Sequence, residues 1–264
     1  MLDIVSNGPH SLTDGSEAPV LVLGHSLGSQ HYMWDAVVTK LKDIRVIRYD
    51  LPGHGSTPAK RREEPLTMTA LLHELLETLD HLGIQYFHVA GLSLGGMVAM
   101  AAAEYSPRVL SATIMSAGPI NQPSQAWWDK AALVRANGTA QLVDATLERW
   151  FTEDFRTRSG LEEVARIREI FLTCDDEGYA QCCEVLAQSD LRSDLGNIAV
   201  PVTLVSAEHD ATMPWDMADQ IADTLQRGQC PEVQVEHVQH LRHMLAVENP
   251  DLAAQILQAR VSGC

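Results

Sequence analysis

Ser93 lies at the centre of the sequence Gly91-Leu92-Ser93-Leu94-Gly95, a spacing that can present a serine hydroxyl as a nucleophile. An apolar run precedes this motif, and small residues follow it from Gly96 to Ala103, which predicts a strand, a sharp turn and a helix. Such a turn lifts the hydroxyl out of the sheet and points a helix N-terminus at the place where negative charge develops. A serine placed in this way attacks a carbonyl carbon once a base has removed its proton.

The acid that orients the base is expected in a loop after a later strand, because an elbow of this kind takes its partners in the chain order serine, acid, histidine. We predict that Asp210 is this acid, since it follows the strand-like run 200–206 and precedes Pro214, where the loop ends. Glu208 is the alternative, because it lies closer to the end of the strand.

The base is expected after the last predicted strand, where His240 and His243 both lie in one loop. We predict that His243 is the base, because an apolar turn follows it directly and can pack against the sheet to fix the imidazole ring. His240 lacks this support and remains the alternative. His25 and His54 precede the serine, and we expect them to be structural.

A serine nucleophile also needs two donors for the oxyanion that forms on the attacked carbonyl. The backbone N–H of Leu94, directly after the serine, is expected to supply one of them. The loop Gly24 to Ser29 leaves an earlier strand and is expected to supply the other, from the N–H of Leu27, with Ser26 as the alternative.

These residues require a sheet whose strands end at one edge, and the hydrophobic patterns predict one. Strand patterns alternate with helical patterns, which is typical of a mostly parallel sheet with helices on both faces. Between residues 117 and 197 only helical patterns occur, so we expect an α/β core formed by 1–116 and 198–264 and an inserted all-helical cap formed by 117–197. The expected strands are 20–23, 45–49, 86–90, 109–116, 200–206 and 233–238, and the expected helices outside the cap are 34–41, 67–82, 96–103, 215–225 and 245–261.

Composition narrows the possible partners. The formal net charge of -16 disfavours nucleic acid and anionic membrane surfaces as partners, and no segment has the length and apolarity of a membrane span or a secretion leader. The cysteines show no metal-ligand spacing, and we expect reduced thiols in a cytoplasmic protein. They are Cys174, Cys182, Cys183, Cys230 and Cys264.

These motifs resemble those of the α/β-hydrolase superfamily and, more narrowly, of the bacterial 3-oxoadipate enol-lactonases of the β-ketoadipate pathway in aromatic catabolism. The wider resemblance covers nearly the whole chain: 24–29, 49–56, the serine motif, 210–214, and His243 with Glu248 and Pro250. The narrower one rests on 33–35 and on stretches of the predicted cap and its end: 148–152, 155–156, 178–183 and 190–192.

The resemblance implies that Ser93 attacks a lactone carbonyl, His243 accepts the serine proton and Asp210 holds the imidazole. It implies no metal and no organic cofactor. It also implies a small substrate with a free carboxylate, for which we predict Arg135 as the cationic partner and Trp127 and Trp150 as lining residues. The alternatives are a carboxylesterase or lactonase for another small ester, and a small-molecule receptor with the same fold.

Overall fold

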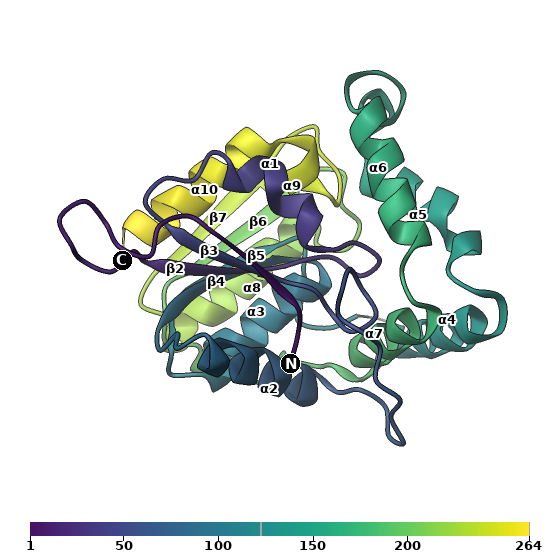
Figure 1. The fold of residues 1–264 in the computed structure, drawn as a ribbon, viewed down its shortest axis with the longest axis horizontal. Coiled ribbons are helices and arrows are strands. Elements are labelled where there is room, and N and C mark those ends of the chain that lie inside the picture. The colour runs from purple at the N-terminus through teal and green to yellow at the C-terminus, as the bar shows by residue number, and fades with distance from the viewer. Residues whose placement is uncertain (122, 264) are drawn as a thin grey trace.

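The computed structural model describes residues 1–121 and 123–263, and these form a seven-stranded sheet between two layers of helices (Figure 1). The spatial order of the strands is β1-β3-β2-β4-β5-β6-β7; β1 runs antiparallel to β3, and all other neighbours are parallel. The parallel strands therefore end at one edge, as the sequence predicts. Their bounds are β1 (Ile4–Asn7), β2 (Val20–Gly24), β3 (Arg45–Tyr49), β4 (Phe87–Leu92), β5 (Val109–Met115), β6 (Val202–Ala207) and β7 (Val233–Val238).

Helices cover both faces of this sheet (Figure 1). One face carries α1 (Asp35–Val38), α9 (Leu245–Glu248) and α10 (Pro250–Ser262), and the other carries α2 (Met68–His81), α3 (Leu94–Tyr105) and α8 (Trp215–Arg227). Every residue of β4 and of β6 is buried, because helices shield both sides of these strands. None of the helices in the described part of the chain is long and apolar enough to cross a bilayer.

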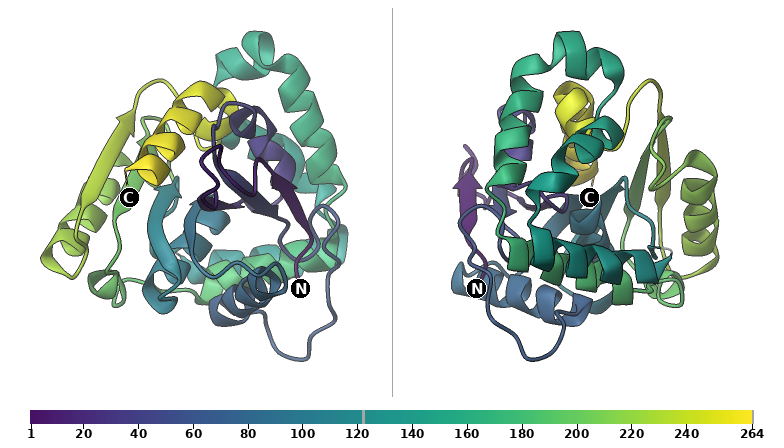
Figure 2. Two further views of the ribbon diagram at one scale, coloured as in Figure 1. Left: turned by 60° about the vertical axis from the view of Figure 1, so that its left-hand side comes forward. Right: turned by 90° about the vertical axis from the view of Figure 1, so that its right-hand side faces the viewer.

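The segment between β5 and β6 is helical, as predicted, and lies at one end of the sheet (Figure 2). Among the described residues it contains no strand, only an isolated bridge between Ile120 and Asp190 that joins its first and last parts. Helix α4 packs along α7, and α5 packs against α6. The main helices are α4 (Ser124–Asn137), α5 (Val143–Trp150), α6 (Leu161–Leu172) and α7 (Asp176–Gln188). That this segment forms a separate cap with boundaries at 117 and 197 stays a prediction.

Two predicted helices differ from the observed ones. The pattern from residue 34 to 41 forms only the single turn of α1, preceded by a 3-10 turn over His31–Trp34. The pattern from 245 to 261 forms two helices, because the side chain of Asn249 accepts a hydrogen bond from the Leu252 amide and starts α10 anew, with a proline in its first turn.

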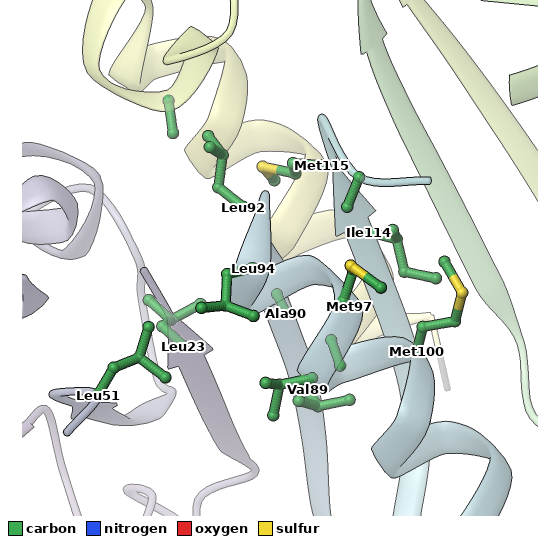
Figure 3. Close-up of a cluster of buried hydrophobic side chains, with 14 of the residues drawn as sticks. Leu23, Leu51, Val89, Ala90, Leu92, Leu94, Met97, Met100, Ile114 and Met115 are labelled. Atoms are coloured by element: carbon green, nitrogen blue, oxygen red, sulfur yellow. The ribbon is translucent and has the colours of Figure 1, made fainter. Parts of the chain in front are cut away.

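Apolar side chains from β2, β4, β5 and α3 pack together beneath the end of β4 (Figure 3). Leu23, Val89, Leu94, Met97 and Ile114 are all nearly inaccessible to solvent. This packing fixes the strand and the helix on either side of Ser93. The cysteines of the described chain are Cys174, Cys182, Cys183 and Cys230, all free thiols, whereas Cys264 lies outside the described residues.

Candidate active site

Ser93 joins β4 to α3 at the sharp turn that the sequence predicts, and its backbone is strained. Its φ of 59° and ψ of -118° are unfavourable for a residue with a side chain, at a cost of about 1–3 kcal/mol. The turn is also very tight: a Cβ atom on Gly91 would collide with the Gly95 carbonyl, and one on Gly95 would collide with the backbone of Gly24. Glycine at 91 and 95 is therefore a steric requirement, and the packed strand and helix hold Ser93 in place.

The loops after β6 and β7 bring Asp210 and His243 together. His243 Nδ1 lies 3.1 Å from Asp210 Oδ1 and 3.2 Å from Oδ2, and each residue is only 4% exposed. Because a carboxylate can only accept, Nδ1 carries the ring proton, which leaves Nε2 as the basic nitrogen. Burial raises the pKa of Asp210, but the charge of His243 and hydrogen bonds from His243 and the Thr212 amide outweigh it, so the pKa lies below its ordinary value.

The alternative acid and base, Glu208 and His240, lie outside this pair. Glu208 Oε2 accepts a hydrogen bond from the His240 amide at 2.8 Å and lies 3.3 Å from its Nδ1, and both side chains face solvent. Together with His209 they place ligand atoms within 4.8 Å of one another, a surface group that could hold a cation. Neither residue lines the cavity next to Ser93.

Ser93 and His243 line one cavity of about 510 Å³ between the sheet edge and the helices that follow β5. This volume suits a small molecule. Leu27 and Ser26 line the same cavity. Within the described chain, the backbone N–H groups of Leu27 and Leu94 donate to no other residue, so both can donate to a ligand.

Two buried histidines hold the loop that carries Leu27. His25 Nδ1 donates to the Ser26 carbonyl at 2.8 Å while its Nε2 accepts from the Leu51 amide at 2.9 Å. His54 Nδ1 donates to the Pro52 carbonyl and its Nε2 accepts from the Gly28 amide, both at 2.9 Å. Burial lowers the pKa of both rings, that of His54 to about 3, so both are neutral at pH 7 and keep these donor and acceptor roles.

The prediction that Arg135 reaches this cavity is wrong. Its guanidinium lies 2.8 Å from Glu177 and 2.6 Å from Glu184, both on α7, and it lines a different cavity. Two hydrogen bonds to Glu177, and to a smaller extent the one to Glu184, raise the pKa of Arg135. Trp127 and Trp150, by contrast, both line the cavity next to Ser93.

Sequence reasoning missed two cationic residues of the cavity wall, Lys130 on α4 and Arg149 on α5. A signal for Lys130 was present. Trp127 and Lys130 lie three positions apart and so share one face of a helix, and in the structure the Lys130 ammonium lies 4.0 Å from the centre of the Trp127 ring.

Comparison with known proteins points to one family. Residues 20–256 match the alpha/beta hydrolase family. The chain is 30% identical to 3-oxoadipate enol-lactonase 1 of Acinetobacter baylyi over 262 residues, 98% of this chain and 92% of the relative. It is 33% identical to 3-oxoadipate enol-lactonase 2 of that organism over 200 residues, 74% of this chain and 73% of the relative. The crystal structure of the enol-lactonase from Burkholderia xenovorans LB400 is similar over 100% of this chain and 96% of its own, with a TM-score of 0.89 and 28% identity.

Proposed function

Because the chain belongs to the alpha/beta hydrolase family and has its fold, we propose that it opens the ester bond of a small carboxylated enol-lactone. The relatives named above support hydrolysis of an ester, and their names make 3-oxoadipate enol-lactone the first substrate to test, with 3-oxoadipate as the product. The free thiols of the described chain fit a reducing compartment, and we place the protein in the cytoplasm.

The observation that carries this proposal is the buried pair of Asp210 and His243 beside a serine on a strained turn. In the proposed reaction His243 Nε2 takes the proton of Ser93 as its oxygen attacks the lactone carbonyl. The amides of Leu27 and Leu94 stabilise the oxyanion.

Collapse of this intermediate breaks the ring C–O bond, and the enol oxygen leaves with the proton held by His243. The product remains bound to Ser93 as an ester. Water then attacks the carbonyl of this acyl-enzyme while His243 takes the water proton. The second intermediate collapses, and the Ser93 oxygen leaves with the proton held by His243. The released enol tautomerises to a ketone, which favours ring opening.

The test combines a substrate panel with an active-site label. We expect the wild-type protein to open 3-oxoadipate enol-lactone faster than short p-nitrophenyl esters, and Ser93→Ala to lose at least about a thousandfold in rate while staying folded. A fluorophosphonate should label Ser93. A p-nitrophenyl ester preferred by orders of magnitude would refute the lactone as the substrate, while the proposed hydrolase activity would stand. Absence of labelling would favour a receptor.

A further inference from the structure

The cavity next to Ser93 has a charge opposite to that of the whole protein. The chain carries a formal net charge of -16, yet among the described residues no aspartate or glutamate lines this cavity, whereas Lys130 and Arg149 both do. The cavity beside Arg135 differs, since more carboxylates than arginines line it. The positive wall is therefore local, and it faces the cavity in which the ester would react.

Neither cation is neutralised by the described chain. Arg135 on the same helix as Lys130 is held by Glu177 and Glu184, but neither Lys130 nor Arg149 forms an ion pair with a described carboxylate. Lys130 instead lies over the ring of Trp127, 4.0 Å from its centre. Burial, and then the charge of Arg149, lowers the pKa of Lys130, so the ammonium is partly desolvated and lies close enough to the guanidinium to be repelled by it.

An anion bound between these groups would relieve that repulsion and accept charge-assisted hydrogen bonds from both. The cations stand on α4 and α5, whereas Ser93 and Leu27 stand on the sheet side of the same cavity. A ligand that reaches both walls has an ester carbonyl at one end and an anionic group at the other. A carboxylate fits, because it can accept from an ammonium and a guanidinium at once.

We propose that Lys130 and Arg149 form a carboxylate-binding subsite that selects esters and lactones bearing a free carboxylate over neutral ones. This inference rests on the proposed function. It replaces Arg135 by two residues on a different wall, and it explains how a strongly acidic protein accepts an acidic substrate.

The test compares two esters with the same chain length, mono-p-nitrophenyl adipate and p-nitrophenyl hexanoate, which differ at the far end by a carboxylate in place of a methyl group. We expect Lys130→Met and Arg149→Gln each to lower kcat/KM about tenfold or more for the adipate ester, mainly through KM, and to change the hexanoate ester less than about twofold. Lys130→Arg should restore the preference. Arg168→Gln is the matched control, because Arg168 is a paired arginine on α6 away from the cavity.

Binding of free adipate to Ser93→Ala protein, measured by calorimetry, separates this inference from the proposed reaction. We expect adipate to bind, and Lys130→Met added to Ser93→Ala to weaken the binding about tenfold, with circular dichroism confirming the fold. Unchanged adipate binding in that double variant, or equal losses on both esters, would overturn the subsite. Full esterase activity in Ser93→Ala would instead overturn the proposed mechanism and leave the binding result to decide the subsite.

Discussion

Replacing Glu248 by glutamine tests whether the helices after β5 help to position His243. Glu248 Oε1 accepts hydrogen bonds from the amide and the hydroxyl of Thr152, each at 2.7 Å, and Oε2 accepts from the Arg242 amide at 2.8 Å. A glutamine keeps both bonds from Thr152 only by turning its NH2 group toward the N–H of Arg242. At least one hydrogen bond to a charged group is therefore lost, whichever way the amide turns.

Such a bond contributes about 1.5–3 kcal/mol, and the partial exposure of Glu248 puts the loss near the lower end, about 1.5 kcal/mol. We expect Glu248→Gln to lower the free energy of unfolding by this amount, as measured by urea denaturation. Because Arg242 directly precedes His243, we also expect kcat to fall about tenfold with little change in KM. The rate at which a neutral fluorophosphonate labels Ser93 should fall by the same factor, since labelling needs the histidine but not the cations of the wall.

Glu236→Gln is the matched control, because it removes the same charge from an exposed position on β7. It should leave stability, kcat and the labelling rate unchanged. A Glu248→Gln protein that loses stability yet is labelled at the wild-type rate would refute the reasoning, because the carboxylate would then stabilise the fold without orienting the imidazole.

Three further predictions follow from the contacts of single residues. Asp210→Asn should lower kcat about ten-thousandfold with the fold retained, because an amide no longer fixes the proton on His243 Nδ1. A fall of less than tenfold would contradict the proposed roles of Asp210 and His243. Burial lowers the pKa of His54 to about 3 in the folded protein, against about 6.5 in the unfolded chain, so between these values only the unfolded state takes up the proton. We therefore expect this ring alone to lower the free energy of unfolding by about 2 kcal/mol between pH 7 and pH 5. In urea denaturation at a series of pH values, His54→Gln should lose that part of the pH dependence. Arg135→Gln should lower the free energy of unfolding by about 1–2 kcal/mol, because buried Glu184 loses a partner. The KM of the adipate ester should stay unchanged. An increase in that KM would mean that Arg135 does bind the substrate carboxylate.

The local part of the site could be predicted from the sequence. The turn at Ser93 follows from a buried run, two glycines and a small-residue helix, all within a few positions, and the structure has that turn. The choice of Asp210 over Glu208 rested on loop position. In the structure Asp210 contacts His243, whereas Glu208 contacts His240, and the role of Asp210 as the orienting acid stays a prediction. Each of these signals lies within a few neighbouring residues, so it can be recognised without knowing how distant segments pack.

The spacing of Trp127 and Lys130 was only a partial signal for the cationic wall, because which helix face meets the cavity depends on how the helices rotate against one another. Arg135 lies five positions after Lys130, which is about 140° around a helix axis, so the two cannot face the same neighbour. Only the packing of α4 along α7 decides that Arg135 meets Glu177 and Glu184. The edge strand β1 was missed for a related reason: none of its four residues is fully buried, and the strand depends on pairing with β3.

The end of α5 joins the two parts of the proposed mechanism. Arg149 and Trp150 line the cavity, and the carbonyl of Trp150 accepts a hydrogen bond at 3.0 Å from the amide of Met244, the residue after His243. The guanidinium of Arg242 donates to the carbonyl of Glu148, on the same turn of helix. A movement of α5 away from the sheet would break these bonds and free the loop of the histidine. In the mechanism we propose, a substrate carboxylate held by Arg149 would keep α5 against the loop of His243. The same contact would then favour the imidazole orientation that removes the serine proton.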